Sequence, residues 1–445
     1  MKYLTIAALL MFAPLAVEVT TGVETASTVS AAEKKKRRKV PPMKERTYKA
    51  ISEAQLLIDP DSVPVPEGEE RPDVQADPRK AVEMLQGQLT RRGLNPYEIA
   101  QIWNTLAFAH YTLEDLGSTK TAYEKVLEQS QISLALELSA TRALFQLYYA
   151  DEDYPKAIRF IDKWLAINET PDAGVNFIKA TAYYQMENFD KALETALYVE
   201  QIALEQEREL KENWLYLQVV IYNEKKNFDK VIEVLERLIV VYPKKQYWMH
   251  LAGMYAEKGW DDKSLSAYYA AYVQNLFTKE SEVVMLSQRL LNAEVPFEAA
   301  TILEKGFKDE LIEKTEKNIR LLAMSYTMSK NYSKAIDAWK DATKYADDGI
   351  SFYRLAQALS NEDRHKEAVA AYRNALDRDG LKDIEEVQFW LGISLMQLEE
   401  WDDAKKAFTA AAKDKSRRKT ANQYKAYIDN EVKRQAALAE MLSSN

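Results

Sequence analysis

Apolar residues recur at helical spacing along most of the chain, in pairs of short stretches joined by brief turns. The clearest pair occupies residues 385–414, where Gly392 lies in the first stretch and Ala404 and Phe408 lie in the second. The turn between the two stretches is Glu399–Asp402. Small residues at Gly392 and Ala404 allow two helices to cross closely, while large apolar neighbours give the pair a face to bury. This stretch therefore predicts a helical hairpin.

The same pattern recurs about nine times. One small residue of the second stretch sets the register of each copy, and these anchor residues are Thr119, Ala157, Ala192, Val231, Ser264, Ala299, Ala335, Ala368 and Ala404. Successive anchors are 33 to 39 residues apart, and first stretches carry a large residue, Leu and a small residue in order, as in Trp103/Leu106/Ala107. This spacing resembles the tetratricopeptide repeat (TPR) signature. The composition, low in Gly and Pro, agrees with an all-α fold, and the resemblance implies a right-handed α-solenoid of TPR hairpins.

The N-terminal part of the chain does not follow the repeat. Residues 1–32 contain an apolar run that is too short to span a bilayer comfortably and end in small residues suited to cleavage. We expect a cleavable secretory signal peptide, with an uncleaved anchor or a buried first helix as the alternative. Residues 33–42 form a basic segment, and its Lys34–Lys39 run favours weak, salt-screened contact with an anionic surface over nuclear import.

The other segments follow from the same pattern. Residues 43–99 are expected to form a degenerate first hairpin, interrupted at 59–77 by an acidic, Pro-rich insert that has no face to bury. Residues 100–415 hold about nine TPR-like repeats. Residues 416–445 carry apolar positions amid Lys and Arg, which predicts one helix that caps the exposed face of the last repeat.

Few residues of the chain suit catalysis. There is no Cys, and the three His lie in different repeats without a partner at helical spacing, so thiol chemistry and a helix-borne His metal site are both excluded. The common nucleotide-binding and hydrolase motifs are absent. A net charge of −9 disfavours nucleic acid. We therefore expect a non-enzymatic protein with no cofactor, metal or small-molecule substrate.

The candidate site is a partner-binding groove. In the TPR family the first helices line the concave side, so the resemblance places their outward residues there. These are aromatics, amides and one arginine, which suit an extended peptide or a partner helix, and they are Asn104, Phe108, Tyr111, Arg142, Tyr149, Phe177, Tyr184, Asn213, Tyr216 and Asn223. Because Asn lowers helix propensity and this face gains nothing from packing within a hairpin, contact with a partner would explain these residues. The alternative for each is that it fills space between helices.

The groove lacks the basic cluster with which some TPR domains clamp a carboxylate. Arg142 and Arg320 are isolated in the sequence pattern, so a co-chaperone of that type is not favoured.

Several stretches carry a closer resemblance. Examples are MKERTYKAISEAQ at Met43–Gln55, GLNPYEIAQIWNTLAF at Gly93–Phe108 and YPKKQYWMHLAGMYAEKG at Tyr242–Gly259. They are similar to periplasmic TPR proteins of Gammaproteobacteria that are encoded beside a TonB/ExbB/ExbD system. The resemblance implies a periplasmic adaptor assisting TonB-dependent uptake, such as that of iron-siderophore complexes, with TonB-system periplasmic domains as candidate partners. The alternative is a scaffold for another envelope complex, such as outer-membrane or polysaccharide-export machinery.

Overall fold

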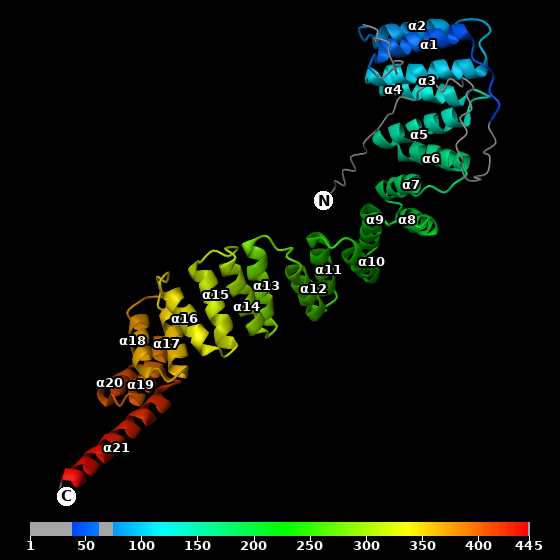
Figure 1. Ribbon diagram of the computed structural model, residues 1–445. Coiled ribbons are helices and arrows are strands. Elements are labelled where there is room, and N and C mark those ends of the chain that lie inside the picture. The colour runs from blue at the N-terminus through cyan, green and yellow to red at the C-terminus, as the bar shows by residue number, and fades with distance from the viewer. Residues whose placement is uncertain (1–37, 62–73, 444–445) are drawn as a thin grey trace, which may run out of the picture. The chain divides into compact units, whose positions relative to one another are not determined.

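The structure is a computed structural model that describes residues 38–61 and 74–443 (Figure 1). The described residues form 21 α-helices and no strand, so the all-α prediction is confirmed. The expected signal peptide, most of the basic run and most of the acidic insert lie outside the described residues. No helix within the two described ranges is long and apolar enough to cross a membrane.

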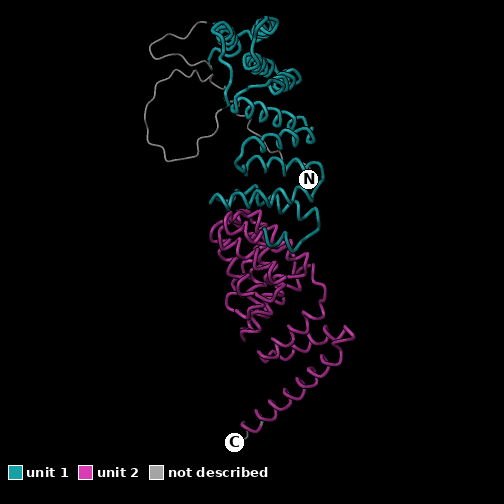
Figure 2. The backbone as a smooth tube through the Cα atoms, turned by 90° about the vertical axis from the view of Figure 1, so that its right-hand side faces the viewer, with its two compact units in different colours: residues 1–234 teal, residues 235–445 magenta. Residues whose placement is uncertain are grey.

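Unit 1 runs to Val234 (Figure 2). It contains four helical hairpins, each built from an odd-numbered first helix and an even-numbered second helix that pack together. They are α1 (Glu45–Ile58) with α2 (Pro78–Leu89), α3 (Pro96–Thr112) with α4 (Leu116–Leu127), α5 (Leu134–Ala150) with α6 (Tyr154–Asn168), and α7 (Ala173–Gln185) with α8 (Phe189–Glu205). The next helices are α9 (Glu212–Glu224), which packs on α8, and α10 (Phe228–Val241), in which the unit ends.

Unit 2 begins at Leu235. Its hairpins are α11 (Lys245–Glu257) with α12 (Asp261–Val273), α13 (Glu280–Asn292) with α14 (Pro296–Lys308), α15 (Glu316–Met328) with α16 (Tyr332–Thr343), α17 (Ile350–Asn361) with α18 (His365–Leu376), and α19 (Ile384–Gln397) with α20 (Trp401–Ala411). Each hairpin also packs on the next hairpin in the chain. The long helix α21 (Arg418–Ser443) follows α20 and packs on it.

Small residues lie where the helices of each hairpin approach one another. All nine anchor residues are buried, with an exposed fraction of 2% or less. In the hairpin of α19 and α20, a Cβ atom added to Gly392 would lie 2.9 Å from a ring carbon of Phe408. A side chain at this position would displace the ring. The repeat spacing therefore reflects a steric requirement at the helix crossing.

Short polar side chains start the helices of unit 1. From α2 to α8, the residue before every helix is Asp, Asn or Ser, and its side chain accepts a hydrogen bond from a backbone N–H of the first turn. These caps satisfy donors that have no partner inside the helix. The cap of α3 is a full capping box between Asn95 and Glu98.

The turns between first and second helices share one backbone feature. In all nine repeats the residue five positions before the anchor has a φ between 54° and 71°. Only one of these residues is glycine, and the full set is Glu114, Glu152, Glu187, Lys226, Gly259, Glu294, Lys330, Asp363 and Glu399. The left-handed region ends a first helix so that the chain can reverse. Non-glycine residues adopt it here at some conformational cost.

Helix α21 covers the end of the last hairpin. Ala421 and Ile428 are fully buried, and the ring of Tyr424 stacks on Phe408 with centroids 5.1 Å apart. Farther along, the indole of Trp401 donates a 3.3 Å hydrogen bond to Gln435. The predicted long C-terminal helix is confirmed, and its capping role has a physical basis because these contacts cover apolar side chains of α20.

Candidate protein-binding surface

The ten predicted groove residues come from four first helices of unit 1, namely α3, α5, α7 and α9. We call the surface made by these ten residues the first-helix face of unit 1. Three of them, Arg142, Asn213 and Asn223, are exposed, and the other seven are half-buried. The half-buried members are the aromatic side chains and Asn104. This face therefore combines partly covered rings with three exposed polar side chains.

Two of the aromatic side chains pack within their own hairpins. Tyr149 lies edge-on to Tyr154 of the following helix, with ring centroids 5.3 Å apart. Tyr184 lies tilted against Phe189, with ring centroids 5.8 Å apart. The argument that this face gains nothing from packing within a hairpin is therefore wrong for Tyr149 and Tyr184. Each ring supports the turn that joins a first helix to its second helix.

Other rings on this face connect neighbouring hairpins. Phe177 packs against a buried cluster that includes Trp214 and against a second cluster that includes Leu217, so it joins α7 to α9. Phe108 packs against the buried cluster shared by α3 and its neighbours. For these two residues, filling space between helices is part of their role.

Hydroxyl groups extend the contacts from one first helix to the next. Burial raises the pKa of Tyr149, and a hydrogen bond with Thr181 of α7 opposes that shift. Burial also raises the pKa of Tyr184, as do the nearby Glu224 and Tyr216 of α9. Charges on α9 therefore act on Tyr184, and the hydrogen bond with Thr181 links Tyr149 to the next first helix.

Arg142 rests on an aromatic ring of its own hairpin. Its guanidinium lies 5.1 Å from the ring centroid of Trp164 in α6. This cation–π contact orients the arginine while its side chain stays exposed. With Asn213 and Asn223 of α9, it supplies hydrogen-bond donors and acceptors that a partner can reach.

The described end of the basic run lies against unit 1. Arg38 forms an ion pair with Glu137 at the start of α5, and Lys163 approaches the other oxygen of the same carboxylate at 3.7 Å. The charge of Arg38 is therefore partly neutralised within the chain. Contact of Lys34–Lys39 with an anionic surface stays a prediction.

In unit 2 the equivalent face carries polar contacts that the sequence pattern did not reveal. Arg320 of α15 is not isolated, because its guanidinium donates to Asp348 at 2.7 Å and to the Ser351 hydroxyl at 2.8 Å. Ser351 lies in the first turn of α17, and Asp348 lies in the loop just before it. Arg320 therefore links α15 to α17 and the loop before it. Its guanidinium is already bonded within the chain.

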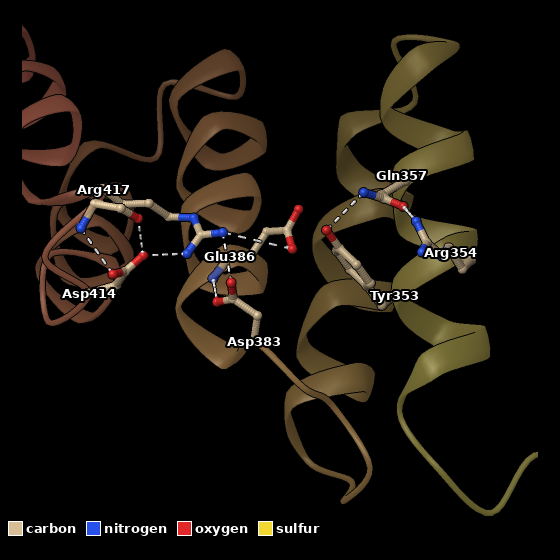
Figure 3. Close-up of polar contacts among 8 residues, drawn as sticks. Tyr353, Arg354, Gln357, Asp383, Glu386, Asp414 and Arg417 are labelled. Carbon is tan, nitrogen blue, oxygen red and sulfur yellow. Dashed lines mark hydrogen bonds and ion pairs between the residues drawn. The ribbon is translucent and has the colours of Figure 1, made fainter.

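Two further groups of polar contacts lie near the C-terminal end, one between α19 and the residues just before α21 and one within α17 (Figure 3). Arg417 pairs with Asp383 at 2.7 Å and with Asp414, and it lies 3.9 Å from Glu386. Burial raises the pKa of the Tyr353 hydroxyl, and the negative charge of Glu386 adds to the shift. The same hydroxyl accepts a 2.8 Å hydrogen bond from Gln357. The Arg417 ion pairs connect the start of α19 to the residues just before α21.

One signal in the sequence points to these positions. Arg320 and Tyr353 each lie fifteen residues before the anchor of their repeat, as do Asn104, Arg142, Phe177 and Tyr216 in unit 1. Extending the same register into the C-terminal repeats would have identified them. The acceptor of Arg320 could not be identified this way, because Asp348 lies in a connecting loop.

The chemistry of the described residues is that of a binding surface. No group of three or more His, Asp or Glu side chains in the described ranges is arranged to hold a metal ion. Burial lowers the pKa of His250, which favours its neutral form. The ten predicted residues offer ring faces, amides and one guanidinium, which can stack and form hydrogen bonds with a polypeptide.

Family models for the tetratricopeptide repeat match residues 351–380 and 386–414. These ranges cover α17 with α18 and α19 with α20. No curated protein matches the chain. The two matched hairpins share their anchor residues and left-handed turns with the other seven repeats.

Solved structures similar to this chain include three TPR proteins. A tetratricopeptide repeat protein from Parabacteroides merdae is 14% identical, covers 63% of this chain and 99% of its own, and has a TM-score of 0.34. YrrB, described as having an unusual peptide-binding site, is 14% identical, covers 44% of this chain and 99% of its own, and has a TM-score of 0.35. The TPR2AB domain of yeast Sti1 in complex with an HSP90 peptide is 15% identical over 66% and 98%, with a TM-score of 0.28.

The two matched ranges are therefore tetratricopeptide repeats. The other hairpins repeat their anchor and turn geometry.

Proposed function

We propose that this protein is a scaffold that binds protein partners through the first-helix face of unit 1. The observation that carries the proposal is that α7 and α9 are neighbouring first helices, with half-buried Tyr184 on the first and half-buried Tyr216 and exposed Asn213 and Asn223 on the second. A polypeptide lying across α7 and α9 would meet rings and amides together. The ring of Tyr184 already packs on Phe189, so it would need little reordering on binding.

The chemistry of this face suits a mainly uncharged segment. Asn213 and Asn223 can each form paired hydrogen bonds with backbone groups, while the tyrosine rings offer area for side chains. The only cation among the ten residues is Arg142, and the cation–π contact with Trp164 holds it in place. A partner with one acidic side chain near Arg142 would gain a charge-assisted hydrogen bond.

The finer form of the proposal is a periplasmic adaptor of a TonB/ExbB/ExbD system. Its support is the resemblance of stretches such as Tyr242–Gly259 to periplasmic TPR proteins encoded beside such systems. The location test is to sequence the N-terminus of the protein recovered from the periplasmic fraction, and we expect it to begin at Ala32 or Glu33. Full-length protein recovered with the inner membrane would contradict a cleaved signal.

The binding test uses the exposed members of the face. We expect the full chain to bind isolated TonB-system periplasmic domains in a titration, and the triple variant Arg142→Ala/Asn213→Ala/Asn223→Ala to bind them at least about tenfold more weakly. Tyr149 and Tyr184 are left intact because their rings support the hairpin turns.

The matched control is Asn422→Ala/Asn430→Ala, which removes two exposed amides of α21. Circular dichroism should show equal helicity for all three proteins. Equal binding by the triple variant would contradict the first-helix face as the site. Absence of binding by the unchanged chain would contradict the TonB-system partner, and the scaffold role would then be tested with other envelope proteins.

A further inference from the structure

The second helix α8 has apolar residues on its exposed side as well as on its buried side. Leu197 and Tyr198 are each 42% exposed and Leu204 is 59% exposed, while the opposite face buries Ala192, Ala196, Val199, Ile202 and Ala203 against the neighbouring helices. The three exposed residues, with Gln201, recur at intervals of three and four and so form one stripe. We call these four residues the α8 stripe. The buried face of α8 is sufficient to pack the helix into its hairpin. It does not explain why the α8 stripe is apolar.

The register of the repeats makes this stripe unusual. In four other second helices, the residue five positions after the anchor is acidic and paired with a side chain of the neighbouring hairpin. These pairs are Glu124 with Tyr148 at 2.7 Å, Asp162 with Lys179 at 2.7 Å, Glu236 with Tyr255 at 2.7 Å and Glu304 with Lys334 at 3.2 Å. In α8 the same position is Leu197. A polar link between hairpins is there replaced by exposed hydrocarbon.

Acidic side chains lie at both ends of the stripe. Glu194 lies one turn before Leu197 and Tyr198, and Glu205 follows Leu204. The Glu205 carboxylate accepts a 2.8 Å hydrogen bond from Gln201 in the middle of the stripe. The helix as a whole carries four acidic residues and one lysine. An apolar stripe between two carboxylates is complementary to an apolar stripe between two cations.

We propose that the α8 stripe binds an amphipathic basic helix of a partner protein. Apolar residues of that helix would cover Leu197, Tyr198 and Leu204, and Lys or Arg side chains near its ends would pair with Glu194 and Glu205. The two carboxylates are eleven residues apart, or about 16 Å along the helix axis, which sets the spacing of the cations. This surface lies on a second helix and does not depend on the first-helix face.

The charges also separate this partner from a second copy of the chain. A two-fold, antiparallel pairing of two α8 helices across the stripe would place Glu194 of one copy opposite Glu205 of the other. Like charges at such an interface repel and lower its stability. An anionic membrane or a nucleic acid would be repelled by the same carboxylates. A cationic helix is the occupant that the charges of α8 favour.

The experiment titrates the full chain with a synthetic helical peptide. The probe is an 18-residue fluorescent peptide with Leu at i, i+3, i+4 and i+7 and Lys at both ends, and the comparison probe has Glu in place of every Lys. We expect the basic peptide to bind, the acidic peptide to bind at least about tenfold more weakly, and the basic peptide to lose affinity as salt increases. Fluorescence anisotropy reports each affinity.

Variants locate the binding on α8. Leu197→Ser/Leu204→Ser should weaken binding of the basic peptide at least about tenfold, and Glu194→Gln/Glu205→Gln should weaken it and reduce its salt dependence. The matched control is Val273→Ser, since Val273 of α12 is 58% exposed and lies in unit 2. The glutamine variant changes no apolar contact, so it remains informative if the serine variant loses helicity.

Several results would overturn the proposal. These are equal affinity for the two peptides, no binding of the basic peptide by the unchanged chain, or unchanged binding by both α8 variants. Self-association of the chain that Leu197→Ser/Leu204→Ser abolishes would assign the stripe to a second copy. Loss of basic-peptide binding in the variant Arg142→Ala/Asn213→Ala/Asn223→Ala would show that the peptide binds the first-helix face instead.

Discussion

The buried carboxylate of Glu98 offers the sharpest test of how the first hairpin is held. Its side chain has no exposed area. One oxygen accepts from the Lys44 N–H at 3.0 Å and from the Thr47 hydroxyl at 2.7 Å, and the other accepts from the Asn95 N–H at 3.0 Å. Burial alone would raise the pKa of Glu98, but these hydrogen bonds outweigh it and hold the pKa below its ordinary value of 4.5. The carboxylate therefore ties the start of α1 to the start of α3.

Glu98→Gln keeps the shape of the side chain and removes its charge. One oxygen becomes an NH2 group, so at least one of the donors around it loses its acceptor. A hydrogen bond to a charged group contributes about 1.5–3 kcal/mol, and an unpaired buried donor adds to the loss. We expect the free energy of local opening of α1 to fall by about 2–3 kcal/mol, which corresponds to roughly 30- to 150-fold faster amide exchange.

Hydrogen exchange is the suitable assay because repeat arrays open in segments, so a single melting temperature would average over the chain. Peptides from α1 and α2 should show the change, and those from α17 to α20 should not. The matched control is Glu45→Gln, which breaks only the exposed pair with Lys49 and should change exchange by less than about twofold. Unchanged protection of α1 in Glu98→Gln would refute the reasoning.

The same carboxylate predicts a pH dependence. Because the pKa of Glu98 is lower in the folded protein than in the unfolded chain, its stabilising effect is fully present above pH 4.5 and is lost as the pH falls through the folded pKa. Relative to Glu98→Gln, the extra protection of α1 in the unchanged protein should therefore shrink in acid. A constant difference between the two proteins across this range would show that the carboxylate's charge is not responsible.

Three further predictions concern the C-terminal helix and the turns. Deleting residues 416–445 should uncover the apolar side of α20 and cause association or a lower melting temperature, and a monomeric product with unchanged melting would rule out the capping role. Arg417→Met should lower the free energy of local unfolding at the start of α21 by only about 1 kcal/mol, because its ion pairs are partly exposed. Faster amide hydrogen exchange confined to the start of α21 would verify this. Glu152→Gly should stabilise its hairpin by about 0.5–1 kcal/mol, because glycine adopts the left-handed conformation without the strain of a side chain, whereas Gly259→Ala should destabilise its hairpin by a similar amount. Local hydrogen exchange of each hairpin measures both effects. Changes of the opposite sign would contradict the turn argument.

The sequence by itself determined the repeat register and the fold class. Anchors such as Ala157 and Ala404 must be small because two helix backbones approach there, and this steric demand recurs with the period of the hairpin. The cap at Asn95 is equally local, since its side chain bonds to a backbone group three residues away, although no cap was predicted. The left-handed turns were missed, because eight of the nine residues are Glu, Lys or Asp and only Gly259 carries the usual glycine signal.

Only the tertiary structure decided what the first-helix residues touch. Tyr149 and Tyr184 look like surface aromatics in the sequence, yet their rings pack on the next helix. Arg320 looks isolated, yet it reaches Asp348 in a loop 28 residues away. Conversely, Leu197 is a large apolar residue of the kind usually found in a core, yet its side chain is exposed. The physical reason is that helical periodicity determines the side of its own helix on which a residue lies, whereas its contacts depend on how neighbouring hairpins pack.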